Sequence, residues 1–399
     1  SVSDGEAPAQ TVSFVVNDGM DDSTTVATAQ INVISVNDPP IITSGATQNY
    51  TEDTGAVAVD AAIQVSDADD DLLTGAWVKI DGGYVAGEDV LGFTSVGGIT
   101  GTFNTGLGIL SFTNTNSLAN YELLLQGVTY ENTAGSDPTT GVRTIQFWAS
   151  DGTDDSAIVT STVNVIDVND PPVITVGDTQ NYTEGDAPTF VDTSVTITDA
   201  DDAEMQSAVV KITGGFQPAE DKLNFTNTAN ITGSYLNGTL TLSGPDLVAN
   251  YEAALETVKY VNTNTVDPVT GTRTISFWVN DGADDSNTAV AEINVVGVNS
   301  PPVVTAGETQ NYTEGDGTVE VDTTITLADP DNTSLASAKI TITGGYAADE
   351  DVLAYDGTDF GATWDSANGI LTLTAAPSLA VYESALASLT SGNLATSSP

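Results

Sequence analysis

Carboxylates are the side chains of this chain that could do chemistry. The 399 residues include 56 acidic and 7 basic side chains, no histidine and no cysteine, and carry a formal net charge of −49. Because histidine and cysteine are absent, a catalytic base or nucleophile would have to come from paired carboxylates or a metal. A compact chain this acidic repels itself unless cations lie among its carboxylates. We therefore expect bound divalent cations and no enzymatic activity.

The acidic residues recur with a period of roughly 130 residues. The phrase Asn-Tyr-Thr-Glu begins at Asn49, Asn181 and Asn311, and a Val-Asn-x-Pro-Pro linker precedes each copy. A glycosidase needs two carboxylates placed across a cleft, yet the acidic clusters here return in each copy, as expected of a scaffold. Internal repetition therefore sets the domain organisation.

The linkers define the predicted domain boundaries. Paired prolines at 39/40, 171/172 and 301/302 restrict the backbone and make short, stiff connectors. The segment SFVVNDGMDDS near the start matches SFWVNDGADDS from Ser276, whereas the last copy stops before such a segment. We predict two orphan C-terminal strands of a repeat in 1–38, complete repeats in 39–170 and 171–300, and a repeat lacking its last two strands in 301–399.

Strand signals dominate each repeat. Val, Ile, Thr, Phe and Tyr alternate with polar residues at period two, as in 11–16 and 143–148, and Gly and Asx turns lie between such runs. One segment per repeat, such as 117–125, instead spaces apolar residues three and four apart and predicts a short helix with Ser117 as N-cap. Many short strands indicate an all-β chain of tandem Ig-like, Greek-key β-sandwiches, which stiff linkers would join into a linear rod.

Two further recurring features leave alternatives open. Asp-Gly pairs followed by two carboxylates begin at Asp18, Asp151 and Asp281; we interpret them as tight hairpin turns, with a further cation site as the alternative. Trp148 and Trp278 each follow a Phe in one strand, so one member of each pair must face outward or lie under a loop. We expect core packing for these aromatic pairs rather than a sugar platform.

Composition also bounds the partners and the location. The charge disfavours nucleic acid and anionic membranes as partners, and no run of 18 apolar residues predicts membrane insertion. Ser1 in place of Met suggests a processed or excised product. Acidic, cysteine-free tandem repeats rich in Thr, Asn and Gly suggest an exported microbial surface protein, which would be secreted. We therefore expect an extracellular, cell-surface location.

Three motifs point to a family. A Glu lies about a dozen residues after each linker, an Asp-x-Asp pair lies about 28 residues after it, and an Asp-x-Asn-Asp-type linker ends the repeat. The motif residues are Glu52, Glu184 and Glu314; Asp67, Asp69, Asp199, Asp201, Asp329 and Asp331; and Asp167, Asn169 and Asp170. In these motifs essentially the whole chain resembles bacterial cadherin-like repeats, and in layout the chondroitin-sulfate-proteoglycan-type repeats, of large surface adhesins.

The resemblance implies calcium ions between successive domains. Ca²⁺ takes six to eight oxygen ligands, which clustered carboxylates and Asn carbonyls supply. Strand directions allow the Glu, a far-end Glu-Asp pair, the linker and the next Asp-x-Asp pair to meet. Near residue 170 the implied ligands are Glu52, Glu88, Asp89, Asp167, Asn169, Asp170, Asp199 and Asp201. Near residue 300 they are Glu184, Glu220, Asp221, Asn299, Asp329 and Asp331.

The third linker departs from this pattern. Gly297 stands where the second linker has Asp167, and Ser300 stands where it has Asp170. The first linker has Ser35 at the former position but keeps an Asp at the latter. Fewer formal charges should weaken cation binding at the third linker or remove one ion there.

The two ends of the chain are complementary within the repeat. The orphan strands would expose six large apolar residues: Val12, Phe14, Val16, Val26, Ile31 and Val33. At about 1.5–3 kcal/mol for each side chain fully buried, these represent on the order of 10 kcal/mol before entropy losses. We expect residues 1–38 to complete the last repeat of a neighbouring copy, in a head-to-tail homopolymer. The calcium ligands at that joint would be Asn37, Asp38, Asp67 and Asp69 of one copy and Glu314, Glu350 and Asp351 of the other.

The expected function is thus an extracellular structural or adhesive fibre that calcium stiffens. The alternative is that the 399 residues are a segment of a longer bacterial adhesin whose ligand- or glycan-binding tip lies elsewhere. A cell-surface glycan or protein is the further partner that we consider. A ligand site in this chain should be a cluster that does not repeat; none stands out, although Gly92–Gly108 and Thr226–Gly238 vary between copies.

Overall fold

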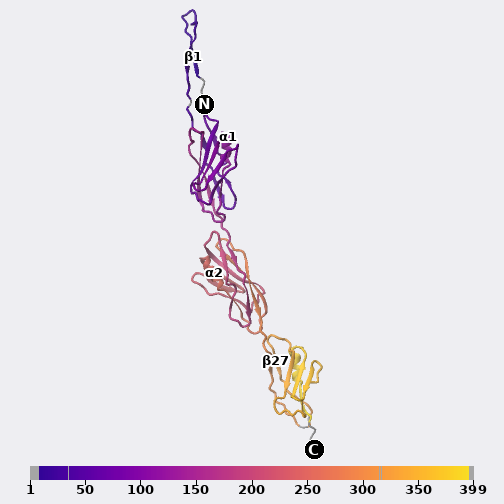
Figure 1. Ribbon diagram of the computed structural model, residues 1–399. Helices are drawn as coiled ribbons and strands as arrows, with labels where there is room; N and C mark the ends of the chain where they lie inside the picture. The colour runs from indigo at the N-terminus through magenta and orange to yellow at the C-terminus, as the bar shows by residue number, and fades with distance from the viewer. Residues whose placement is uncertain (1–8, 35, 314, 316, 395–399) are drawn as a thin grey trace. The chain divides into compact units, whose positions relative to one another are not determined.

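The computed structural model describes residues 9–34, 36–313, 315 and 317–394. Strands prevail in these residues, and the three predicted helices are present (Figure 1). The chain divides into two compact units, residues 1–171 with 199–203 and residues 172–198 with 204–399. The prediction of an all-β chain of tandem β-sandwiches is confirmed. Across the described segments, we find no helix with the length and apolar character that a membrane crossing requires.

A two-stranded hairpin begins the described chain. β1 (Gln10–Phe14) pairs antiparallel with β2 (Ala27–Ile31), shown in indigo in Figure 1. Every residue of both strands is exposed, including Phe14 at 54% and Ile31 at 52%. The two strands predicted near the start are therefore present, and no described residue covers their apolar side chains.

The first repeat is a sandwich of two unequal sheets. The larger sheet consists, in spatial order, of β4 (Thr47–Thr51), β13 (Val159–Ile166), β12 (Gly141–Ser150), β7 (Leu72–Gly82), β10 (Ile109–Ser117) and β9 (Thr100–Asn104). The smaller sheet consists of β5 (Val57–Ala58), β11 (Thr129–Asn132) and β8 (Asp89–Gly92), and a separate pair joins β3 (Ile41–Thr43) to β6 (Gln64–Ser66). Phe147 of the larger sheet and Tyr130 of the smaller one are fully buried in the core that the two sheets share.

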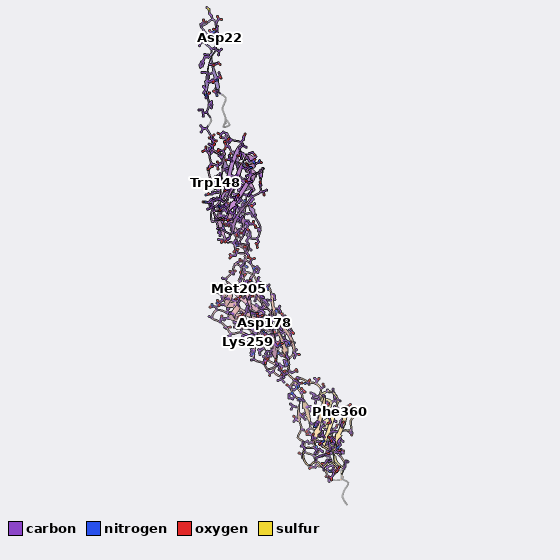
Figure 2. All side chains as sticks on the ribbon, in the orientation of Figure 1. Asp22, Trp148, Asp178, Met205, Lys259 and Phe360 are labelled. Atoms are coloured by element: carbon purple, nitrogen blue, oxygen red, sulfur yellow. The ribbon has the colours of Figure 1, made fainter. Side chains whose placement is uncertain are left out.

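Alternation along each strand decides which side chains enter this core. In β12, Arg143 and Phe147 are buried, while Trp148 lies half-buried on the opposite face. Trp148 (Figure 2) stacks on Trp77 of β7, with ring centroids 5.8 Å apart and planes inclined by 13°. Phe147 is therefore the core member of the pair and Trp148 the outward-facing one, because the period of two that turns Phe147 inward turns its neighbour outward.

Each repeat contains one short helix. In the first repeat the helix buries Tyr121 and Leu124 in the core. The predicted N-cap is confirmed, since the Ser117 hydroxyl accepts a hydrogen bond from the Asn120 N–H at 3.3 Å. The helices are α1 (Leu118–Gln126), α2 (Val248–Glu256) and α3 (Leu379–Ala387).

The second repeat has the same arrangement. Its larger sheet consists of β15 (Thr179–Thr183), β24 (Ala289–Val296), β23 (Gly271–Asn280), β18 (Glu204–Gly214), β21 (Thr239–Leu247) and β20 (Thr232–Leu236). Its smaller sheet consists of β16 (Thr189–Phe190), β22 (Lys259–Asn262) and β19 (Asp221–Asn224), and a separate pair joins β14 (Val173–Thr175) to β17 (Thr196–Thr198). Phe277 and Tyr260 fill its core at the positions that Phe147 and Tyr130 occupy in the first repeat.

The third repeat has smaller sheets. One sheet consists of β28 (Ser337–Thr341), β31 (Ile370–Thr374) and β30 (Gly361–Asp365). The others are β26 (Val319–Glu320) with β32 (Thr390–Asn393) and β29 (Asp351–Ala354), and β25 (Val303–Thr305) with β27 (Thr326–Ala328). Within the described residues β28 pairs on one side only, whereas its counterparts β7 and β18 pair on both sides.

Two side chains of the third repeat are uncovered as a result. Val304 is 57% exposed and Tyr312 is 39% exposed. Residues 309–313 also form no strand, although the same Asn-Tyr-Thr phrase forms β4 and β15 in the other repeats. The corresponding residues of the first two repeats, which are at most 4% exposed, are Ile42, Ile174, Tyr50 and Tyr182.

Candidate metal centres at the linkers

Each linker binds the Asp-x-Asp loop that follows it. A backbone N–H of the linker donates to the second carboxylate of the pair, at 3.2 Å to both oxygens in the first linker and at 2.7 Å in the third. One backbone donor thus holds a carboxylate beside each linker. The residues, donor first, are Asp38 with Asp69, Asp170 with Asp201, and Ser300 with Asp331.

The first Asp of the pair is held by its own loop. Asp67 Oδ1 accepts hydrogen bonds from the N–H groups of Asp69 at 3.1 Å and Asp70 at 3.0 Å, which is an Asx turn. Asp199 accepts the equivalent bonds at 3.1 and 2.8 Å. The turn uses one oxygen of each carboxylate, and the other oxygen, Oδ2, is buried without a partner.

Glu52 brings a buried carboxylate to the second linker. Its side chain is only 7% exposed, and Oε1 accepts a hydrogen bond from the Val168 N–H at 2.8 Å. Burial raises the pKa of Glu52, and the carboxylates of Asp167 and Asp170 raise it further against the lowering effect of the Val168 bond. The neighbouring Asn169 directs its amide to the carbonyl of Asp170 at 3.4 Å. Carboxylates gathered out of water in this way are costly unless a cation lies with them.

Unpaired oxygen atoms identify these clusters most directly. Among the described residues, six buried side-chain oxygens have no hydrogen-bond partner, and leaving such an atom unpaired costs about 1–3 kcal/mol. All six lie at the first two linkers: Asn37 Oδ1, Glu52 Oε2, Asp67 Oδ2, Asp167 Oδ1, Asp199 Oδ2 and Asp201 Oδ1. The ion pairs of the described chain lie elsewhere, at Lys79–Asp81, Arg143–Asp89 and Arg273–Asp221.

One of the Asp-Gly turns joins the first linker. Asp151 forms the expected turn, since its Oδ1 accepts from the N–H groups of Thr153 at 2.6 Å and Asp154 at 2.8 Å. It also lies with Asp67 and Asp70 in a group whose ligand oxygens are all within 4.8 Å of one another. The Asn37 amide donates to Asp151 at 3.1 Å and to Asp154 at 2.9 Å. The sequence favours a plain turn, and the recurrence of its carboxylates in each copy is the feature that indicates the alternative of a cation site.

The third linker is built with fewer buried carboxylates. Glu184 accepts from the Val298 N–H at 3.0 Å, as Glu52 does from Val168, but its side chain is partly exposed. The hydrogen bond from the Ser300 N–H lowers the pKa of Asp331. Asn332 donates its side-chain amide to Asn299 at 3.1 Å and its N–H to Asp329 at 3.1 Å. No described side chain here has a buried, unpaired oxygen, and the predicted ligand Glu314 lies outside the described residues.

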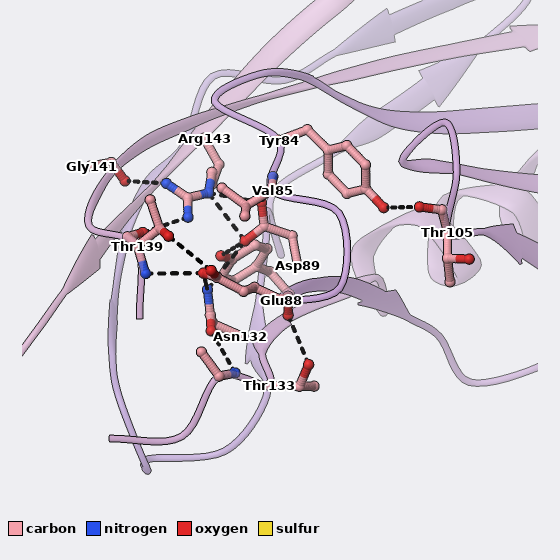
Figure 3. Close-up of polar contacts among 12 residues, drawn as sticks. Tyr84, Val85, Glu88, Asp89, Thr105, Asn132, Thr133, Thr139, Gly141 and Arg143 are labelled. Atoms are coloured by element: carbon pink, nitrogen blue, oxygen red, sulfur yellow. Dashed lines mark hydrogen bonds and ion pairs between the residues drawn. The ribbon is translucent and has the colours of Figure 1, made fainter. Parts of the chain in front are cut away.

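The far-end Glu-Asp pair of the first repeat lies in a separate network (Figure 3). Asp89 is 1% exposed and accepts from Arg143 Nε at 2.9 and 3.1 Å. Glu88 accepts from the N–H and the hydroxyl of Thr139 at 2.9 and 2.8 Å, and these bonds lower its pKa against the effect of burial. We predicted this pair as ligands beside Glu52; the hydrogen bonds of Asp89 are directed to a guanidinium that strand alternation buries, because a buried arginine requires a carboxylate.

The other two repeats reproduce part of this network. Asp221 pairs with Arg273 at 2.8 Å, and Glu220 accepts from the Val269 N–H at 3.0 Å. In the third repeat Asp351, next to Glu350, accepts from the Ala347 N–H at 2.8 Å and the Asn393 amide at 3.2 Å. Among the described residues no arginine pairs with Asp351.

The donor atoms at the linkers select one kind of ligand. Carboxylate and amide oxygens suit hard divalent cations, and the chain offers no cysteine or histidine for a softer metal. The first linker contributes Asn37, Asp67, Asp70 and Asp151; the second contributes Glu52, Asp167, Asp170, Asp199 and Asp201. These residues fit a calcium ion, whose six to eight flexible oxygen ligands tolerate such an irregular set.

Comparisons with known proteins give low identities. No protein-family model matches the chain. The chain is similar to the extracellular repeats of mouse cadherin-23 EC22-24, at 14% identity over 86% of this chain and 90% of that one, with a TM-score of 0.31. It is also similar to protocadherin gamma B2 extracellular cadherin domains 1-5, at 14% identity over 94% of this chain and 60% of that one, with a TM-score of 0.30. In sequence it is 26% identical over 408 residues to halomucin of Haloquadratum walsbyi (strain DSM 16790 / HBSQ001), an alignment that spans 90% of this chain and 4% of halomucin.

Proposed function

We propose that this chain is a calcium-stiffened segment of an extracellular structural or adhesive repeat protein. The observation that carries the proposal is the set of buried, unpaired oxygens at the first two linkers. Their number and their common location indicate a shared partner, and the ion pairs of the described chain do not involve them. A divalent cation at each linker would pair these oxygens and reduce the self-repulsion of a chain with 56 acidic residues.

The proposed ligands follow from the contacts. At the second linker Glu52 and Asp201 are held by backbone donors, so one oxygen of each remains for the ion. Asp167 and Asp199 each contribute a further unpaired oxygen. Glu88 and Asp89 are assigned to the Arg143 network instead. A linker that calcium holds between two sandwiches would bend less than the same linker without the ion.

Calorimetric titration of the whole chain with Ca²⁺ tests this proposal. The triple variant Asp167→Asn/Asp199→Asn/Asp201→Asn should bind at least one ion fewer, or bind it at least tenfold more weakly, about 1.4 kcal/mol. A control variant with the same change of charge is Glu131→Gln/Asp137→Asn/Asp359→Asn, which alters exposed carboxylates that are not among the proposed ligands. Equal calcium binding by the wild type and both variants would refute the linker sites.

We also propose that the N-terminal hairpin completes the third repeat of another copy. The hairpin exposes Phe14 and Ile31, while β28 has an unpaired side, and Val304 and Tyr312 are uncovered in the third repeat. In the first repeat the strands β12 and β13 fill that place, and the hairpin has the sequence of such a strand pair. Pairing β1 with β28 would cover the apolar residues of both partners and repeat head to tail.

Sedimentation velocity over a range of concentrations tests the joint. The chain should form oligomers whose size grows with concentration, and Phe14→Asp/Ile31→Asp should leave it monomeric. Met20→Asp is the matched control, because Met20 lies at 92% exposure in the hairpin turn and would not enter the joint. A peptide of residues 9–34 should bind the chain that lacks residues 1–36. The joint would be excluded if the wild type stays monomeric and the peptide does not bind the shortened chain.

The competing proposal is a longer protein of the same period, in which the hairpin completes a preceding repeat of its own chain. The alignment with halomucin favours this proposal, because it covers 90% of this chain but only 4% of halomucin, which is therefore a far longer protein. The mass of the native polypeptide separates the two: about 40.9 kDa favours assembly, and a mass several times larger favours the longer chain.

A further inference from the structure

A groove of about 730 Å³ opens on the smaller sheet of the second repeat. Its floor contains a row of three residues paired across that sheet, Phe190, Lys259 and Asn224. Its walls come from helix α2 and the adjoining Thr257, from Asp246 of β21, and from residues 225–226 and 228–230. All of these residues belong to one compact unit, and Lys259 is labelled in Figure 2.

The row that forms this floor does not repeat. In the first repeat the same three positions hold Ala58, Thr129 and Gly92, and in the third they hold Glu320, Thr390 and Ala354. Among the three rows, the second alone combines an aromatic ring, a cation and an amide. Buried positions such as Tyr121, Tyr251 and Tyr382 keep their residue type in all three repeats, whereas this row differs in each.

Helix α2 leaves the groove open at one position. Ala253 lines the wall, whereas the same position of α1 holds Leu123, whose side chain is 56% exposed. A leucine at position 253 would extend three more carbon atoms from the wall. The small side chain of the second repeat therefore keeps the space above the row free.

The groove offers an aromatic face beside a polar wall. Phe190 is 43% exposed, and the Lys259 ammonium lies 4.3 Å from its ring centroid, which orients the ring and leaves part of its surface to solvent. Along the wall, the Asp246 carboxylate accepts hydrogen bonds from the amides of Asn250 at 2.6 Å and Asn230 at 3.3 Å. These bonds fix a carboxylate and two amides in one orientation.

We propose that this groove binds a short saccharide of one to three rings. A sugar presents an apolar C–H face, which suits the exposed part of Phe190, and hydroxyls at its edge, which suit amides, a carboxylate and an ammonium. The volume of the groove lies in the range of small-molecule sites. A polyanion is disfavoured by a chain of net charge −49. The proposal is independent of the linker cations, because none of the proposed linker ligands lines this groove.

Saturation-transfer NMR of the whole chain with a panel of neutral and acidic mono- to trisaccharides tests the proposal. At least one saccharide should bind, and the binding should survive a chelator. Ala253→Leu should weaken it at least tenfold by filling the groove. Phe190→Ala and Lys259→Thr should each weaken it severalfold. All three changes introduce the residue that the first repeat carries at the same position, which the fold accommodates there.

The matched control is Leu123→Ala, which removes a leucine from α1 without supplying the row of the second repeat, and it should leave the affinity unchanged. Near-UV circular dichroism checks that each variant is folded. Two results would overturn the proposal. In the first, no saccharide of the panel binds the wild type, either at 10 times the protein concentration or at millimolar excess. In the second, folded Ala253→Leu and Phe190→Ala bind the saccharide as well as the wild type does. Binding lost only in Leu123→Ala would place the site in the first repeat and also overturn it.

Discussion

At the scale of single residues, the linkers show how a buried carboxylate can be held while one oxygen stays available. A backbone N–H or an Asx turn binds one oxygen of Glu52, Asp67, Asp199 and Asp201, and the other oxygen is buried and unpaired. Such a site is preorganised, because its donors are already fixed before an ion arrives. Without the ion, the buried and unpaired oxygens of such a site destabilise the fold. The effect of a substitution on stability should therefore depend on calcium.

Glu52→Gln should therefore have opposite effects with and without calcium. In a chelator the change removes a buried charge whose Oε2 is unpaired and should raise the stability of the first repeat. In calcium it removes a ligand and should lower the affinity at least tenfold, about 1.4 kcal/mol. Hydrogen exchange of residues 160–172 in both conditions measures the two signs. Glu184→Gln is the control and should change less in both, because Glu184 is partly exposed. An equal loss of stability with and without calcium would mean that Glu52 only accepts the hydrogen bond from the Val168 N–H.

A second residue-scale prediction concerns Asp192, which is fully buried. It accepts hydrogen bonds from the N–H groups of Gly177 at 2.8 Å, Asp178 at 2.9 Å and Ser194 at 2.8 Å. Burial raises its pKa, but these bonds outweigh burial and bring the pKa below the usual range. A lowered folded-state pKa gives stability that is present above the unfolded value, about 3.9, and is lost as the pH falls through the folded value.

Asp192→Asn should accordingly cost about 2–3 kcal/mol above pH 5, since it replaces an ionic acceptor of several bonds by a neutral amide. The difference in unfolding free energy between this variant and the wild type should shrink towards pH 3. Below about pH 3.9 the unfolded wild type binds a proton at Asp192 more readily than the folded wild type does. Urea unfolding followed by circular dichroism between pH 3 and 7 measures this. Asp322→Asn, at the equivalent position, is the control and should alter the unfolding of the third repeat instead. A difference that does not change with pH would contradict the ionic role.

The site residues differ in how far the sequence predicts them. Glu52 and the Asp-x-Asp pairs are predicted because the same residue types return at the same offset from each linker. The ion pair of Asp89 is not predicted by the same reasoning, because its partner Arg143 lies 54 residues away in another strand. Only the inward alternation of β12, once its neighbours are known, shows that the arginine is buried and takes the carboxylate.

At the scale of elements, local pattern predicts the strands and helices, whereas pairing decides which of them persist. The phrase Asn-Tyr-Thr is identical in all three repeats, yet it forms β4 and β15 and no strand at 309–313. β4 and β15 pair only with β13 and β24, and the third repeat has no such partner among the described residues. A strand edge without a partner leaves its N–H and C=O groups to water, so the local sequence alone does not determine the outcome.

Helix capping gives a matched test at this scale. Ser117 accepts a hydrogen bond from the Asn120 N–H, while Ser378 at the start of α3 makes no side-chain capping bond. Ser117→Ala should destabilise α1 by about 1 kcal/mol, the typical cost of losing an N-cap. Ser378→Ala should change α3 by a few tenths of that amount. Hydrogen exchange of residues 118–126 and 379–387 compares them, and equal effects would show that the Ser117 bond contributes nothing.

At the scale of the whole molecule, 56 acidic side chains against 7 basic ones make cations part of the stability of the chain. The linkers differ in what they offer to such ions. The second linker has Asp167 and Asp170 where the third has Gly297 and Ser300. The buried, unpaired oxygens differ between the linkers in the same direction, since the second linker has them and no described residue of the third linker does. As the calcium concentration rises, the second linker should therefore stiffen before the third.

Limited proteolysis with elastase at controlled free calcium tests this order, because Val168 and Val298 give both linkers the same cleavable residue. Without calcium both linkers should be cut. As calcium rises, the linker at Val168 should become resistant at a concentration at least tenfold lower than the linker at Val298, because it supplies two more carboxylates. Magnesium at equal concentration should protect far less, since it loses its water ligands reluctantly and requires near-octahedral geometry. The variant Gly297→Asp/Ser300→Asp restores both carboxylates and should bring the two thresholds together. If both linkers become resistant at one concentration in the wild type, or if the restored carboxylates move nothing, the linker charges do not set calcium binding and another group must pair the oxygens of Glu52 and Asp201.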